Sequence, residues 1–71
     1  MTQADLTRLF ENLEESCGYG FIQPRGGAYR AIDAICATDK DHKFTMDEVG
    51  ELLADYPLLT WGLKQIISNN Y

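Results

Sequence analysis

Apolar side chains recur three or four positions apart in four separate segments of this 71-residue chain. That spacing places side chains on one face of an α-helix, whereas a half-buried strand would need alternation at every second residue. The pattern therefore predicts an all-α fold, and the length allows one helical domain, residues 1–71. The expected helices are about residues 3–17, 28–38, 46–56 and 59–68, with a glycine-rich structured loop at 18–27.

The first expected helix has a marked amphipathic pattern. Thr2 is expected to cap it, because Asp5 follows three residues later in a capping-box arrangement. Gly18 is the expected C-terminal stop. Glu11, Glu14 and Glu15 fall mainly on the side opposite the apolar residues, which are Leu6, Leu9, Phe10, Leu13 and Cys17.

The segment 18–27 contains four of the six glycines and Pro24. Neither a helix nor a regular strand is expected to run through it, although a short extended stretch at 20–23 is compatible with the sequence. Its apolar residues are too many for a solvated linker, so we expect the loop to fold back against the helices. These residues are Tyr19, Phe21 and Ile22.

Residues 28–38 form the second expected helix. Its apolar face consists of Tyr29, Ile32, Ile35 and Cys36. Cys17 and Cys36 both fall on apolar faces, so we expect both thiols to be buried, reduced and unreactive. Whether the two are bonded is left open, because that depends on their Cα geometry.

The third expected helix has two independent start signals. Thr45 and Glu48 form a T-x-x-E capping box, and Phe44 with Val49 forms a hydrophobic staple. Pro57 ends the helix, because the residue before a proline is pushed out of the α region. The apolar face holds Val49, Leu52, Leu53 and Tyr56, and that of the fourth helix holds Leu59, Leu63, Ile66 and Ile67.

The chain is acidic, since six lysines and arginines stand against eleven aspartates and glutamates for a net charge of −5. The cations are scattered, so the overall field repels phosphate backbones and anionic membranes and favours a partner with a basic surface. The N-terminus lacks the apolar stretch of a signal peptide, and no segment approaches the ~18 apolar residues of a membrane span. We therefore expect a cytoplasmic protein that does not engage a membrane.

The turn between the second and third helices invites comparison with a calcium-binding loop. Placing Glu48 at the twelfth ligand position puts Ala37 at the first and His42 where a glycine is needed. The register that begins at Asp39 fails as well. His42 has no cysteine or second histidine in reach for a zinc site, and the glycines do not form a phosphate-binding motif. We expect no catalytic, metal or cofactor site and no enzymatic activity.

Residues 28–71, AYRAIDAICATDKDHKFTMDEVGELLADYPLLTWGLKQIISNNY, resemble the tri-helical core of helix-turn-helix and winged-helix transcription regulators. In those families a supporting helix and a turn precede a capped helix, and a recognition helix follows. The resemblance implies that residues 59–68 are the recognition helix and that the chain binds DNA, with a dimer adding two half-site contacts.

Two features depart from that family. A recognition helix presents arginine, lysine, asparagine or glutamine to DNA, whereas Lys64 is the one cation among the outward residues Thr60, Trp61, Lys64 and Gln65. The preceding helix carries an acidic ridge of carboxylates spaced by four, Asp47, Glu51 and Asp55. Phosphate contacts normally dominate DNA affinity, so this surface disfavours DNA.

The same surface is better suited to binding a protein. Leu58, Trp61 and Gln65 are expected nearer the surface, and tryptophan is enriched at interface hot spots. Alternatively, Trp61 completes the small core. The acidic ridge is suited to pairing with a basic partner or to imitating the phosphates of a nucleic acid; the alternative is a solvated helix face.

The leading prediction is a small acidic, non-enzymatic interaction module or inhibitor that modulates a larger protein, with nucleic-acid-binding proteins among the candidates. In size and acidity the chain resembles phage-encoded proteins that block host nucleic-acid-binding machinery. The alternatives are a helix-turn-helix DNA-binding regulator and a divalent-ion-responsive helix-loop-helix. The identity of the partner and homodimerisation are left open.

Overall fold

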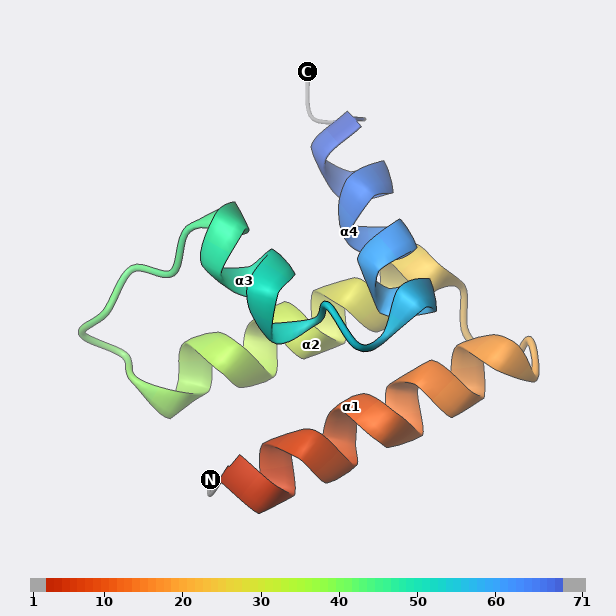
Figure 1. Ribbon diagram of the computed structural model, residues 1–71, viewed down its shortest axis with the longest axis horizontal. Coiled ribbons are helices and arrows are strands. Elements are labelled where there is room, and N and C mark those ends of the chain that lie inside the picture. Colours follow the sequence, from red (N-terminus) through yellow and green to blue (C-terminus); the bar gives the residue numbers. More distant parts are fainter. Residues whose placement is uncertain (1–2, 69–71) are drawn as a thin grey trace.

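The computed structural model describes residues 3–68, and every regular element in that range is a helix (Figure 1). The all-α class predicted from the sequence is confirmed, while the expected cap Thr2 lies outside the described residues. Helices α2 and α4 pack against each other, and α1 packs against both, in a flat body of 32 × 31 × 16 Å. The elements are α1 (Gln3–Gly18), α2 (Pro24–Thr38), α3 (Met46–Leu52) and α4 (Pro57–Ser68).

Every helix contributes to one apolar core. Burying these side chains removes apolar surface from water, at roughly 1.5–3 kcal/mol for each large residue. Among residues 3–68 no polar or charged side chain is buried, so the thiol of Cys17 is the one ionisable group among the buried side chains of that range. The buried apolar residues are Phe10, Leu13, Cys17, Ala28, Ala31, Ile35, Val49, Leu53, Leu59 and Leu63.

Helix α1 ends in a Schellman motif, and its left-handed residue is Gly20 instead of the expected Gly18. Gly20 has φ 81°, a conformation that glycine adopts without a Cβ penalty. The N–H of Phe21 donates to the carbonyl of Ser16 (2.9 Å), and that of Gly20 donates to Cys17 (3.1 Å). These two bonds satisfy carbonyls that the end of the helix would leave free.

Helix α2 begins at Pro24, so the prediction that residues 18–27 exclude a helix is wrong for residues 24–27. Proline suits the first helical position, because its fixed φ matches the helix and its missing N–H has no partner there in any case. Gln23 is the extended N-cap residue, with ψ 151°. No strand forms at 20–23, where the backbone makes a turn at Gly20 and a bend at Phe21 and Ile22.

The crossing of α2 and α4 explains why glycines stand inside a helix. A Cβ at Gly62 would overlap the carbonyl of Pro24 and lie 2.9 Å from the nitrogen of Arg25. A Cβ at Gly27 would lie 2.8 Å from the sulfur of Cys17 and 3.0 Å from Leu59. The two backbones therefore meet at a distance that a side chain would prevent.

The inward face of α2 combines small residues with Ile35, so the predicted stripe is confirmed at Ile32 and Ile35 and wrong at Tyr29 and Cys36. Ala28, Ala31 and Ile35 are buried, whereas Tyr29 and Cys36 are exposed. The sequence pattern favoured the large apolar residues, but close contact with α1 and α4 leaves room mainly for methyl groups.

Helix α3 starts as predicted and ends earlier than predicted. The Thr45 hydroxyl accepts from the N–H of Glu48 (3.2 Å), and the Glu48 carboxylate accepts from the N–H of Thr45 (3.2 Å), which confirms the capping box. The helix stops at Leu52, not at 56, and α4 begins at Pro57, not 59. The carbonyl of Leu53 accepts from the N–H of Tyr56 (2.9 Å) and from the hydroxyl of Thr60 (2.7 Å). These two hydrogen bonds hold the turn between α3 and α4.

A side chain of α1 caps the start of α4. The carboxylate of Glu14 accepts from the N–H of Leu58 (2.9 and 3.1 Å) and of Leu59 (3.0 Å). These are among the N–H groups that have no partner inside the helix, and the positive end of the helix dipole favours a carboxylate there. Glu14 was expected on the outer side of α1, but it lies half-buried between the two helices.

Candidate functional site

An open groove runs between α3 and α4, with a volume of about 520 Å³. Its apolar lining includes Met46 and Ile67, which are 42% and 50% exposed. Ile67 was predicted to be buried, and the groove is the reason that it is not. The lining residues are Met46, Asp47, Gly50, Glu51, Ala54, Thr60, Leu63, Lys64 and Ile67.

Small residues on the α3 side create this groove. Val49 and Leu53 are fully buried and fasten α3 to the core. The residues that follow each of them, Gly50 and Ala54, line the groove and are too short to fill it. A Cβ at Gly50 would lie 3.8 Å from Leu63, an ordinary contact distance, so a methyl group fits at this point of the groove without displacing Leu63.

The groove carries two carboxylates and one ammonium group. Asp47 and Glu51 are four residues apart on α3, and Lys64 belongs to α4. Within residues 3–68 no hydrogen bond or ion pair engages these three side chains, so their charges are available to a partner. Like charges at i and i+4 oppose each other on an isolated helix, which leaves the acidic side ready for a cation.

Of the six residues predicted as an interaction surface, two line the groove. Asp47 and Glu51 line the groove, whereas Asp55 is exposed in the turn after α3 and so falls outside the helix-spaced ridge. Trp61 is 58% exposed on α4, which excludes the alternative that it completes the core, but it does not line the groove. Leu58 and Gln65 are half-buried.

Helical spacing places Trp61 beside the groove. At about 100° per residue, position 61 lies roughly 60° around α4 from position 64, on the side away from α3. Lys64 therefore separates the indole from the groove, and a partner large enough to span both would contact them together.

His42 is exposed, as predicted, and its ring nitrogen lies 2.8 Å from the carboxylate of Glu48. This hydrogen bond, with that from the Thr45 backbone, holds the pKa of Glu48 below its ordinary value. Over the described range no cluster of three or more histidine, cysteine or acidic side chains could hold a metal ion. The contact between His42 and Glu48 therefore supports the start of α3, where Glu48 is part of the capping box.

Both cysteines are free. Cys17 is buried as predicted, and burial, followed by the nearby charge of Glu14, raises the pKa of its thiol. Cys36 is exposed, so the prediction that both cysteines are core residues is wrong for Cys36. Of the stripe assigned to α2 from the sequence, Ile35 is buried and Ile32 is half-buried, whereas Cys36 lies outside the contact face.

The loop after α1 carries a second surface that the sequence reasoning missed. Tyr19 and Phe21 were expected to fold back against the helices, but they are 69% and 79% exposed, and Ile22 alone of the three is half-buried. The alternation of glycine and aromatic residues at 18–21 could have indicated this surface. A glycine that ends a helix sets the backbone direction of the residues on either side of it, and so the direction of their side chains.

No helix in residues 3–68 combines the length and apolar character that crossing a bilayer requires. Comparisons of the chain with models of protein families, with curated proteins and with solved structures find no match. Function therefore has to be inferred from the residues and their geometry.

Proposed function

We propose that this chain is a non-enzymatic protein-interaction module that binds a basic amphipathic helix of a larger protein along the groove between α3 and α4. The observation that carries the proposal is the combination, in one groove, of exposed apolar residues with unpaired carboxylates of Asp47 and Glu51. An amphipathic helix is the common occupant of an apolar groove between two helices.

The apolar lining of the groove suits the hydrophobic face of such a helix, and its carboxylates suit the basic face. Met46, Leu63 and Ile67 offer apolar surface to its hydrophobic side. Asp47 and Glu51 attract lysine or arginine at its edge, and the net charge of −5 speeds the approach of a basic partner. Trp61 lies beyond Lys64 and adds a large rigid contact at the rim.

A module of this kind modulates its partner by covering a basic surface, and a nucleic-acid-binding protein offers such a surface. DNA itself is a poorer ligand for the same face. Lys64 is the only cation in the groove, and Asp47 and Glu51 would repel the phosphates.

The proposal is tested with a synthetic leucine–lysine peptide that folds as an amphipathic helix, using the fluorescence of Trp61, the sole tryptophan. Replacing both carboxylates by amides, Asp47→Asn with Glu51→Gln, should weaken binding roughly three- to tenfold, as expected for charges at a solvated rim. The matched control is Glu11→Gln with Asp33→Asn, which makes the same charge change at exposed positions outside the groove.

Equal weakening by the two double variants would reject the groove, because long-range attraction alone would then explain binding. Helical circular dichroism checks that both variants stay folded. A mobility shift of duplex DNA that falls steeply with salt and is lost in Lys64→Ala would overturn the proposal in favour of a DNA-binding regulator.

A further inference from the structure

The two aromatic side chains at the end of α1 are exposed on an ordered backbone. The N–H groups of Tyr19, Gly20 and Phe21 all donate to carbonyls of the last turns of α1, at 2.9–3.1 Å. The Schellman motif thus fixes the backbone from which both rings project. Their exposure is a property of a closed hydrogen-bonded turn, and not of a loop that has failed to pack.

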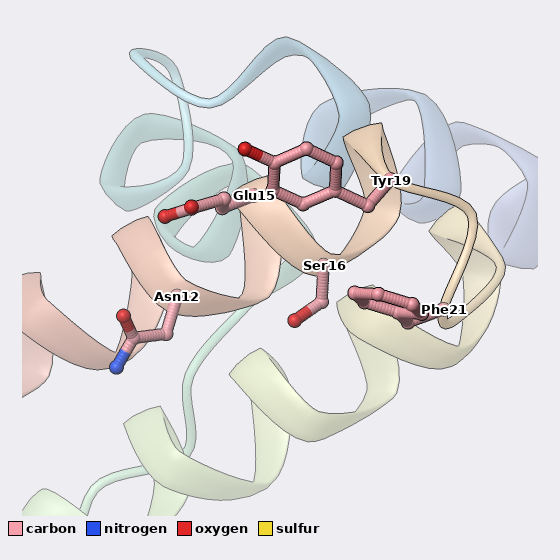
Figure 2. Close-up of a pocket in the computed structure, with 5 residues that line it drawn as sticks. All are labelled: Asn12, Glu15, Ser16, Tyr19 and Phe21. Atoms are coloured by element: carbon pink, nitrogen blue, oxygen red, sulfur yellow. The ribbon is translucent and has the colours of Figure 1, made fainter.

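The rings flank a pocket of about 290 Å³ on the outer side of α1 (Figure 2). Their centroids are 5.9 Å apart and their planes are tilted by 43°, so the two rings contact each other at an angle instead of stacking flat. Figure 2 shows the Ser16 hydroxyl beside Phe21, the Glu15 carboxylate beside Tyr19, and the Asn12 amide farther along α1 from both rings. This pocket shares no residue with the groove between α3 and α4.

We propose that this pocket binds an arginine side chain of a partner protein. A guanidinium group is planar and stacks on the face of an aromatic ring, and its fork of N–H donors matches a carboxylate. Tyr19 and Phe21 supply the faces, and Glu15 supplies the carboxylate. The oxygens of Asn12 and Ser16 are further acceptors for donors that the carboxylate leaves free.

The negative charge of the pocket favours an arginine side chain over anionic ligands. Glu15 is the only charged residue lining the pocket, so phosphate and other anions are repelled. Within residues 3–68 no hydrogen bond or ion pair engages the Glu15 carboxylate. A quaternary ammonium has no donors for the three polar groups, and two rings do not enclose it as an aromatic cage would.

This site goes beyond the proposed groove and does not depend on it. A partner that uses both surfaces would gain avidity without any new contact, because the second binding event becomes intramolecular. Failure of one site leaves the other to be judged by its own variants.

The test is a titration of the full chain, labelled with ¹⁵N, with the blocked tripeptide Gly-Arg-Gly, followed by amide chemical shifts. We expect saturable shifts confined to the five lining residues and their neighbours. Glu15→Gln should weaken binding roughly tenfold and Phe21→Leu about threefold, in line with a charge-assisted hydrogen bond and one cation–π contact. Phe21→Leu keeps an apolar residue in the Schellman motif, and Glu11→Gln is the matched control on the same helix.

Equal binding of the norleucine tripeptide would overturn the proposal, because it would show a merely apolar site. Binding of maltose without binding of the arginine peptide would overturn it in favour of a carbohydrate site. An absence of shifts up to the solubility of the peptide would overturn it as well. Unchanged shifts in the Glu11→Gln control, with weaker binding in Glu15→Gln, would support it.

Discussion

Helix α4 makes two contacts that use small residues in opposite ways. At its crossing with α2, Gly62 and Gly27 allow backbone and side chains to approach closer than any Cβ would permit. Beside α3, Gly50 and Ala54 are also small, but the helices stay apart and a groove remains. A small residue therefore brings helices together only where other contacts pull them in, and elsewhere it leaves an opening that a ligand can use.

The largest effect should come from Gly62→Ala, which breaks the tight crossing. The added methyl would overlap the backbone of Pro24, which cannot rotate away as a side chain does. We expect a loss of about 4 kcal/mol, beyond the common cost of overpacking, against a total of roughly 4–10 kcal/mol for a domain of this size.

Urea unfolding followed by circular dichroism measures this change. Gly26→Ala is the control on α2, because a Cβ there meets nothing within 4 Å. It should gain about 0.5–1 kcal/mol from helix propensity. A Gly62→Ala variant as stable as wild type would show that the two backbones do not meet.

The next effect should come from Leu53→Ala, which removes a fully buried side chain that fastens α3. We expect a loss of about 3 kcal/mol from the lost apolar burial and the cavity left behind. Leu52→Ala is the control, because Leu52 is exposed and should cost under about 1 kcal/mol. Thermal unfolding of both variants checks the difference, and equal costs would mean that α3 is not anchored where we place it.

Gly50→Ala should have a smaller effect of the opposite sign to Gly62→Ala, which sharpens the comparison. The new methyl would meet Leu63 at the ordinary contact distance of 3.8 Å. We expect a gain of about 0.5–1 kcal/mol, because alanine favours the helix over glycine. Chemical unfolding measures the gain, and a loss of stability would show that the groove is already closed.

The smallest effect should be the pH dependence contributed by Glu48. The pKa of its carboxylate is lower in the folded chain than its ordinary value of 4.5, so the folded state binds the proton more weakly than the unfolded state. The stabilisation is present above the ordinary value and is lost as the pH falls through the lowered pKa.

The measurement compares wild type with Glu48→Gln between neutral and acidic pH. Wild type should be the more stable protein at neutral pH, and the difference should shrink below about pH 4.5. A difference that grew on acidification would contradict the assigned direction.

Local patterns in the sequence were enough to predict the parts of the fold that depend on neighbouring residues. The capping box of Thr45 and Glu48 was predicted because its partners stand three residues apart. The buried face of α1 was predicted because Phe10, Leu13 and Cys17 repeat with helical period. Both depend on a single helix and need no knowledge of what packs against it.

Features set by distant contacts could not be predicted in this way. Gly26 and Gly27 indicated a loop by composition, but one of them faces Cys17 and Leu59 inside a helix crossing. The end of α3 depends on Thr60 reaching the carbonyl of Leu53 across the turn. Short-range propensity is overridden where such tertiary contacts decide.

The candidate site was predicted only in part for the same reason. Asp47 and Glu51 were selected by their spacing, and Trp61 by its place on the outward side of the last helix. The groove depends on how α3 sits beside α4, and the placing of Tyr19 and Phe21 depends on which glycine ends α1. The residue pattern of a single segment shows neither the position of α3 beside α4 nor the glycine at which α1 ends.

The reach of Glu14 to the start of α4 means that the last three helices are not a separable module. The N–H groups of Leu58 and Leu59 receive their acceptor from a residue 44 and 45 positions upstream. Residues 24–68 without α1 would leave those N–H groups to water and would expose the core residues that α1 covers. Helices α2, α3 and α4 therefore depend on α1 both for the cap of α4 and for cover of the shared core.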